Sequence, residues 1–246
     1  MVSQLSPDQR SADQQIIYPD CDGQPMANNT EQFRWILVIQ QNLDWLFVDD
    51  PHFFVAGDLF WYPVEGRNNI VVAPDVMVAM GRPRGKRGSY QQWKEDNTAP
   101  QVVFEILSPS NTSEEMDKKL LFFDRYGVEE YYIYNPQTNY LQGWLRGEEG
   151  LDIISQMSDW VSPRLNIRFV LLESELELYR PDGEKFRTYL EIAQRAEQEH
   201  QRAEQAEQAR LNAISRLLKL GLSIEQVAES LGFSVEEVQA KIGVAE

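Results

Sequence analysis

The chain has 246 residues, of which 42% are hydrophobic, enough to bury a sizeable core in one domain with a small appendage. Its formal net charge of −16 argues against non-specific attraction to nucleic acid, because like charges repel. A single cysteine, Cys21, and two histidines, His52 and His200, exclude an internal disulfide and a Cys/His zinc cluster, so any metal site must be built from oxygen, which suits magnesium or manganese.

The sequence gives no sign of a membrane partner. No stretch approaches the roughly 18 consecutive apolar residues of a membrane span. The first residues lack the basic start and apolar core of a signal peptide. We therefore expect a soluble, cytoplasmic protein.

The first half of the chain combines one helix with three strands. Residues 1–29 are polar and turn-rich, and we expect them to be irregular. A helix is predicted from Thr30, which can cap it, with an apolar face at helical spacing formed by Phe33, Ile36, Leu37, Ile39, Leu43 and Leu46. Strands are predicted over residues 51–63, 68–80 and 101–107; Pro74 marks an edge, an end or a bulge in the second, because proline cannot donate to a ladder.

A second helix is predicted over residues 113–126. Thr112 and Glu115 fit a capping box at its start, and Gly127 fits the position just past its end. Strands follow over residues 131–135 and 140–146, and residues 151–179 can form a further hairpin. Strands alternating with a mid-chain helix predict an α/β or α+β fold with a mixed sheet.

The composition changes near residue 186. We divide the chain into an irregular segment (1–29), a main domain (30–185), an Ala/Glu/Gln-rich helix (186–220) and a small helical tail (221–246). The sequence RAEQ occurs at Arg195 and again one heptad later at Arg202. The mostly alanine seam is broken by Glu199 and Arg210, so it could hold a weak coiled coil, and with it a homodimer, although we favour a solvated helix.

The tail resembles a helix-turn-helix. Ala228 stands where the first helix must be small, and Gly232 stands at the turn. The second helix begins with Glu236 and Glu237 in its first turn, which repel phosphate. We favour a helical packing or protein-contact module over a DNA reader.

Two acidic residues lie in predicted strands where apolar residues surround them. Glu105 occupies the middle of the run over residues 101–107, and Asp75 lies between two β-branched runs. Burying an ionised carboxylate without a partner costs several kcal/mol, so each must be paired, protonated or bound to a metal. Two adjacent carboxylates would repel unless a cation lies between them, and a magnesium ion meets that need. Alternatively, each acid lies at a strand end and faces solvent.

A lysine on the second helix is the natural partner. At about 100° per residue, Lys119 falls inside the apolar face and Lys118 at its margin; that face consists of Met116, Leu120, Phe122, Phe123 and Tyr126. A core-facing lysine needs an anion, and Asp75, Glu105 or a substrate phosphate could supply it. The alternative is a lysine that extends along the apolar face to water.

Pro74-Asp75 on one strand, Glu105 on the next and a lysine on the following helix resemble the PD-(D/E)XK nuclease superfamily. More narrowly, the runs APDVMVAMGRP, VVFEILSPSN and KKLLFFDRYGVEEYYIYNP resemble the widespread bacterial family of putative restriction endonucleases, over most of the chain up to about residue 179. The resemblance implies a restriction-endonuclease-like core, a mixed β-sheet flanked by helices, within residues 30–185.

The resemblance also implies roles for individual residues. Asp75, Glu105 and Lys119 would be catalytic, and Asp75, Glu105 and the backbone carbonyl of Ile106 would hold Mg²⁺ or Mn²⁺. The expected reaction is hydrolysis of nucleic acid, DNA in our expectation, by a Mg²⁺-activated water. The chain departs from the superfamily pattern at Leu107, where a lysine is usual, so the lysine would have moved to the helix.

The densest basic run follows the Asp75 strand. RPRGKRGSYQQWK supplies five cations and two aromatic residues that could contact a phosphate backbone and stack on bases: Arg82, Arg84, Lys86, Arg87 and Lys94, with Tyr90 and Trp93. The alternative is a solvated loop. Asp22 and Glu31 are candidates for further acids at the site, whereas we expect Asp58 to be structural.

Two other classes of function remain open from the sequence. One is a catalytically inactive interaction protein on the same fold, which assembles through its acidic helical tail. The other is a transcription-factor-like protein that acts through residues 221–246.

Overall fold

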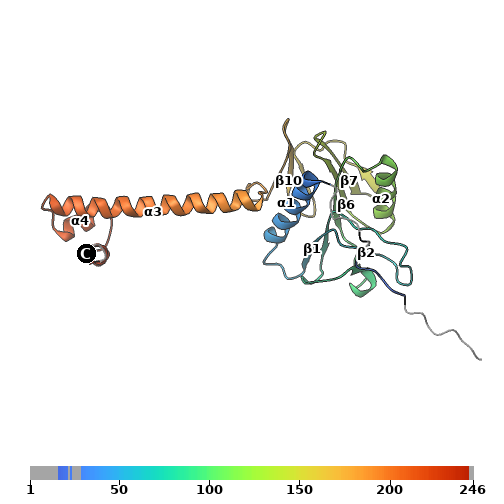
Figure 1. Ribbon diagram of the computed structural model, residues 1–246, viewed down its shortest axis with the longest axis horizontal. Helices are drawn as coiled ribbons and strands as arrows, with labels where there is room; N and C mark the ends of the chain where they lie inside the picture. The colour runs from blue at the N-terminus through green and yellow to red at the C-terminus, as the bar shows by residue number, and fades with distance from the viewer. Residues whose placement is uncertain (1–15, 22, 24–28, 244–246) are drawn as a thin grey trace, which may run out of the picture. The chain divides into compact units, whose positions relative to one another are not determined.

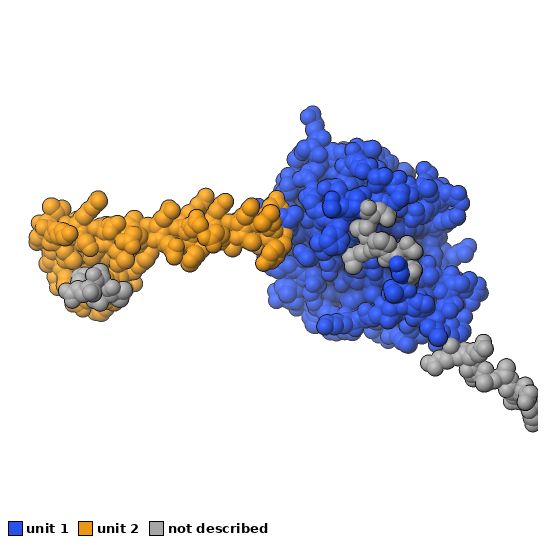
Figure 2. All heavy atoms as spheres, viewed as in Figure 1, with its two compact units in different colours: residues 1–188 blue, residues 189–246 orange. Residues whose placement is uncertain are grey.

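The computed structural model describes residues 16–21, 23 and 29–243, and the chain divides into two compact units, residues 1–188 and 189–246 (Figure 2). The first unit contains a six-stranded sheet in the order β1-β3-β5-β6-β7-β8, a three-stranded sheet and a two-stranded sheet. Its elements are α1 (Thr30–Leu46), β1 (Phe53–Gly57), β2 (Trp61–Tyr62), β3 (Val76–Met80), β4 (Tyr90–Gln91), the 3₁₀ helix η1 (Gln92–Lys94), β5 (Val102–Ile106), α2 (Ser113–Arg125), β6 (Glu130–Asn135), β7 (Tyr140–Arg146), β8 (Leu151–Ile153), β9 (Trp160–Val161), β10 (Arg168–Leu171) and β11 (Leu176–Tyr179).

The large sheet is mixed, which confirms the predicted fold class. Strand β5 is parallel to β6 and antiparallel to β3. Helices α1 and α2 cover opposite faces of the sheet (Figure 1). Because side chains alternate along a strand, Phe104 and Ile106 pack on the α1 face, whereas Val103 packs on the α2 face. Glu105 has the same parity as Val103 and points to α2.

Helix α1 differs from its prediction in its cap and in its buried face. Asn29, not Thr30, is the N-cap, and its side chain accepts a hydrogen bond from the Gln32 backbone N–H at 2.8 Å. Phe33, expected in the core, is 41% exposed, whereas Trp35 is buried. The prediction counted apolar residues alone and so missed two polar residues, Gln32 and Asn42, that are buried on the real inner face.

The strand predicted over residues 51–63 is divided in two. Asp58 has a φ of 48°, a left-handed conformation that aspartate tolerates better than most residues but that interrupts an extended strand. Strand β1 therefore ends at Gly57. In the next predicted strand, Val72 forms an isolated bridge to Trp61, and β3 begins two residues after Pro74, as expected of a proline at a strand end.

A buried carboxylate fastens the large sheet to the segment that carries β9. Glu130 on β6 is fully buried and accepts hydrogen bonds from the Tyr132 hydroxyl at 2.9 Å, from the Ser162 hydroxyl, and from the Arg164 backbone N–H at 2.6 Å. Burial raises the pKa of Glu130, and these donors oppose the rise. The burial of Glu130, the second glutamate of the run GVEEYY, is therefore explained by its hydrogen bonds within the fold.

The second unit consists of α3 (Tyr189–Lys219), α4 (Ile224–Leu231) and α5 (Val235–Gly243). Helix α4 ends at Gly232, which has a φ of 69°, the left-handed geometry that glycine adopts without strain. Val227, Ala228 and Val238 are buried against the end of α3. The coiled coil and homodimer stay predictions. Within residues 29–243, no helix has both the length and the apolar character that crossing a membrane requires.

We predict that Glu130→Ala lowers the free energy of unfolding by about 3 kcal/mol, because it leaves buried donors without an acceptor. Urea denaturation measures the loss. Its control is Glu129→Ala, which removes an ion pair to Arg164 whose side chains are 32% and 46% exposed and should cost about 1 kcal/mol or less. Equal losses in the two variants would contradict the role assigned to Glu130.

Candidate active site

The sheet places the two predicted acids side by side. Strands β3 and β5 are antiparallel with Val76 opposite Phe104, so the same register continued by one residue sets Asp75 opposite Glu105. Both acids point to the α2 face, and they are 8% and 2% exposed. The structure thus brings the two carboxylates together. Their burial excludes the alternative in which each acid faces solvent at a strand end.

Backbone groups hold Asp75 in place. Its Oδ2 accepts a hydrogen bond from the Ile106 backbone N–H at 2.6 Å. The Asp58 N–H donates to the carbonyl oxygens of Pro74 and Asp75, each at 3.2 Å. Burial raises the pKa of Asp75, while the Ile106 N–H and the Lys119 ammonium oppose the rise. The left-handed turn at Asp58 therefore has a positioning role through its backbone.

Lys119 reaches Glu105 from α2. Its Nζ lies 2.8 Å from Glu105 Oε2, whereas Oε1 is buried and has no hydrogen-bond partner among the described residues. Burial is the largest effect on Glu105 and raises its pKa, Lys119 lowers the pKa, and Asp75 raises it. The net pKa of Glu105 is about 8. Burial also lowers the pKa of Lys119, but the Glu105 carboxylate outweighs that effect and the net pKa is raised. Lys119 points inward as predicted, and it stays protonated.

Helix α1 contributes a residue that the sequence reasoning missed. The buried Gln32 amide donates to the Ile106 carbonyl oxygen at 2.9 Å and forms a hydrogen bond that lowers the pKa of Asp75. Gln32 lies three and four residues before the buried Trp35 and Ile36, so it shares their helix face. A glutamine in register with the buried apolar residues was the available signal.

Glu115 was expected to complete a capping box with Thr112, and half of that expectation is wrong. Thr112 does cap α2, since its side chain accepts from the Glu115 N–H at 3.2 Å. The Glu115 carboxylate, however, accepts from the Asn111 amide at 3.3 Å. Glu115 lines a cleft together with Asp75 and Lys119, so it belongs to the candidate site.

The cleft has a volume of about 580 Å³. Polar side chains from α1, α2 and the segment between β1 and β3 line it, among them Gln32, Asp58, Asp75, Glu115 and Lys119. Glu105 lies behind this lining. The cleft is therefore an acidic recess with one ammonium group beside the buried acids.

The donor set fits a small hard cation. Among the described residues, no group of three or more His, Cys, Asp or Glu side chains is arranged to hold a metal ion. Magnesium, however, commonly uses one or two carboxylates and keeps several waters. The buried, unpartnered Oε1 of Glu105 and the adjacent Asp75 meet that requirement. The Ile106 carbonyl accepts from Gln32 and retains its second lone pair.

The part of the predicted basic run around Arg84 lies apart from this cleft. Arg84 pairs with Asp44 and donates to the Phe47 carbonyl oxygen at the C-terminal end of α1. Gln32, near the N-terminal end of the same helix, reaches the acids. Fifteen residues separate Gln32 from Phe47, which is about 20 Å along a helix axis.

Three of the five predicted cations are engaged within the protein. Arg82 and Arg87 both pair with Glu95, at 3.3 Å and 2.6 Å, and Arg84 pairs with Asp44. Lys86 and Lys94 are exposed. The aromatic residues of the run are engaged too, since Tyr90 is buried and donates to the Thr98 carbonyl, and Trp93 contacts Tyr18 at 4.9 Å between ring centroids.

The two further acids are not placed at the site. Asp22 lies outside the described residues. Glu31 is exposed on α1 and pairs with Arg34 at 3.1 Å.

An acid before one strand, an acid in the next strand and a lysine on the following helix are the elements of a PD-(D/E)XK nuclease site. A family model described as "Putative restriction endonuclease" (Uma2) matches residues 6–224. The chain therefore belongs to the Uma2 family of putative restriction endonucleases. No match is found among curated proteins.

Solved structures that resemble the chain include a putative nuclease belonging to DUF820 from Anabaena variabilis ATCC 29413. It has 13% sequence identity and a TM-score of 0.41, and the similarity covers 55% of this chain and 72% of that one. The assignment to the family thus depends on the sequence model, which covers most of the chain.

We predict that Mn²⁺ affinity is strongly pH-dependent. Because burial raises the pKa of Glu105 to about 8, protons compete with the ion below that pH, and affinity should fall about tenfold for each unit of pH between 8 and 6. Calorimetric titration at pH 6, 7 and 8 measures this. Carboxylates with ordinary pKa values near 4 would give a flat profile over that range, and a flat profile would contradict the prediction.

Proposed function

We propose that the protein is a metal-dependent endonuclease that hydrolyses phosphodiester bonds of nucleic acid, with DNA as the expected substrate. The observation that carries the proposal is the pair of adjacent buried acids, Asp75 and Glu105, with Lys119 at 2.8 Å from the second. A stable core has no need of two such carboxylates, since burying them costs free energy. Membership of the nuclease family supports the same conclusion.

The residues that would hold Mg²⁺ are Asp75, Glu105 and the carbonyl of Ile106. When bound, the ion would polarise the phosphate and lower the pKa of a water molecule. The chain's own contribution is to fix the ligands beforehand. The Ile106 N–H and the Gln32 amide orient Asp75 and the Ile106 carbonyl, so little reorganisation is needed on binding.

Lys119 would act on the phosphate. Its ammonium is held at the cleft by Glu105, with its side chain 18% exposed, and its raised pKa keeps it charged at neutral pH. A fixed, partly desolvated cation stabilises the negative charge that develops on a phosphoryl oxygen in the transition state. Lys119 can also orient the attacking water by hydrogen bonding.

The charge of the cleft makes the reaction depend on a cation. Asp58, Asp75 and Glu115 line it, and Lys119 is the single basic residue among those that do. A phosphodiester would be repelled by this balance of charge. A bound divalent cation would offset the net negative charge of these residues, so the same acids that repel free substrate would help to hold it.

We predict that Glu105→Gln abolishes both Mn²⁺ binding and plasmid cleavage, because an amide oxygen carries no charge for the ion. Lys119→Met should retain Mn²⁺ binding, since it removes a competing cation, but lower cleavage by about 100-fold or more. Calorimetry with Mn²⁺ and a plasmid-nicking assay measure the two properties. The matched control is Glu148→Gln, which changes an exposed acid and should leave both unchanged.

Cleavage by Glu105→Gln at the wild-type rate would rule out the proposed site. If the wild-type protein neither bound Mn²⁺ nor cut DNA, the inactive interaction protein would be the better description. Retained Mn²⁺ binding in Lys119→Met, together with lost cleavage, would separate ion binding from phosphate stabilisation.

A further inference from the structure

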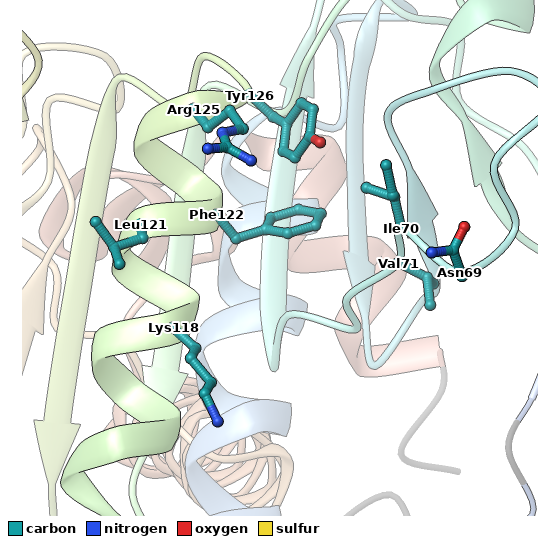
Figure 3. A pocket seen from close by; sticks show the side chains of 8 residues that line it. All are labelled: Asn69, Ile70, Val71, Lys118, Leu121, Phe122, Arg125 and Tyr126. Atoms are coloured by element: carbon teal, nitrogen blue, oxygen red, sulfur yellow. The ribbon is translucent and has the colours of Figure 1, made fainter.

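A second pocket lies beside the candidate active site. It has a volume of about 400 Å³ and is formed by α2 and the segment of residues 69–71 (Figure 3). Val71 lines both this pocket and the acidic cleft. Lys118 lines the pocket, and its chain neighbour Lys119 lines the cleft. The two hollows are therefore adjacent, and we call the second one the α2 pocket.

The charge of the α2 pocket is opposite to that of the cleft. Lys118 and Arg125 line it, and no aspartate or glutamate is among its lining residues. The chain as a whole carries a formal charge of −16. A cationic pocket next to the acidic cleft therefore favours an anionic ligand. Such a ligand would extend from the cleft into the α2 pocket.

Helix periodicity explains how these residues meet. Lys118, Leu121, Phe122, Arg125 and Tyr126 follow the spacing i, i+3, i+4, i+7, i+8, which is one stripe of a helix. This stripe is distinct from the inner one, which carries Lys119 and the buried Phe123. Seven residues separate the two cations, about 10 Å along the axis.

The floor between the cations is apolar and aromatic. Phe122 and Tyr126 contact each other with ring centroids 4.6 Å apart, and both point from α2 toward the segment of residues 69–71 (Figure 3). Leu121 is 69% exposed and adds an apolar side chain to the pocket lining. An aromatic floor between two cations suits a ligand with both flat rings and negative charges.

We propose that the α2 pocket binds a single-stranded segment of nucleic acid that flanks the phosphate in the cleft. Lys118 and Arg125 contact its phosphates, and an unpaired base lies against Phe122. This inference rests on the proposed function, because the pocket's position next to the cleft identifies the ligand. Lys118 pairs with Glu114, but their side chains are 71% and 79% exposed, so the pair is weak enough to be exchanged for a phosphate.

A single strand, and not a duplex, matches the pocket. Bases in a duplex are stacked and paired, so their faces are closed to a protein side chain. An unpaired base can place its face on an aromatic ring, and such stacking is tolerant of sequence. The predicted basic loop offers no such floor, since its Tyr90 is buried.

The test compares two double variants of equal charge change in the full-length protein. Lys118→Gln/Arg125→Gln removes the cations of the α2 pocket, and Lys86→Gln/Lys94→Gln removes the exposed lysines of the basic loop. The probe is a fluorescein-labelled single-stranded DNA 12-mer, titrated with Ca²⁺ present to offset the acids of the cleft, and gel electrophoresis after each titration checks that the 12-mer is intact. Fluorescence anisotropy gives Kd at several salt concentrations.

We expect the α2 double variant to weaken binding at least about tenfold and to lower the slope of log Kd against log salt by about 1.4, the value for two lost contacts to a single strand. The loop variant should bind as the wild type does. Phe122→Leu keeps an apolar side chain against Trp61, whose ring lies 5.5 Å away, and should weaken binding about tenfold through lost stacking. Thermal unfolding of each variant checks that it is folded.

The proposal is overturned if the α2 variant binds like the wild type, if the loop variant weakens as much, if a duplex of the same sequence binds as tightly, or if the wild type does not bind the 12-mer. Wild-type binding that depends on Lys118 and Arg125, without cleavage when Mn²⁺ is added, would support the α2 pocket while rejecting the proposed function.

Discussion

The structure of the first unit is organised around a buried electrostatic conflict. Asp75, the residue before β3, and Glu105 on the antiparallel neighbour β5 lie opposite each other, both on the α2 face and both nearly inaccessible to water. One lysine faces them, so with every group ionised the cluster carries one excess negative charge. Low local dielectric makes that excess costly. Burial accordingly raises the pKa of Glu105, and a divalent cation bound between the acids, as proposed above, would offset the excess.

The surrounding elements hold Asp75 and the Ile106 carbonyl in place beside Glu105. Asp58 adopts a left-handed backbone conformation and donates to the carbonyls of Pro74 and Asp75, and Gln32 enters from the opposite face of the sheet to reach the Ile106 carbonyl. Glu130, by contrast, is a buried carboxylate whose oxygens are met by three protein donors. The difference between satisfied Glu130 and partly unsatisfied Glu105 distinguishes a structural acid from one suited to a ligand.

Local pattern was enough to predict the centre of the site but not its surroundings. An acid within a β-branched run and a lysine on a helix's apolar stripe identified Asp75, Glu105 and Lys119, because strand and helix periods fix which way a side chain points. Gln32 and Glu115 were missed since their partners are set by tertiary packing. The ion pairs of the basic run could not be predicted for the same reason: Arg84 has Asp44 as its partner, forty positions earlier in the chain, a relation that no local window contains. Phosphate contact by this run stays a prediction.

Helix α2 then takes on two electrostatic tasks in one stretch of sequence. Its inner stripe delivers Lys119 to buried Glu105, where the ammonium is fixed and its charge is largely balanced. Its outer stripe presents Lys118 and Arg125 to a pocket whose lining has no acids, and the exposed pair of Lys118 with Glu114 is weak enough to be exchanged for a ligand's phosphate. A strongly acidic protein needs no basic surface overall to meet a polyanion, because screening confines electrostatic attraction to about 10 Å. In the function proposed here, what matters is the order of charges along the substrate's path, from the cations of the α2 pocket to the acids of the cleft that would hold a metal ion.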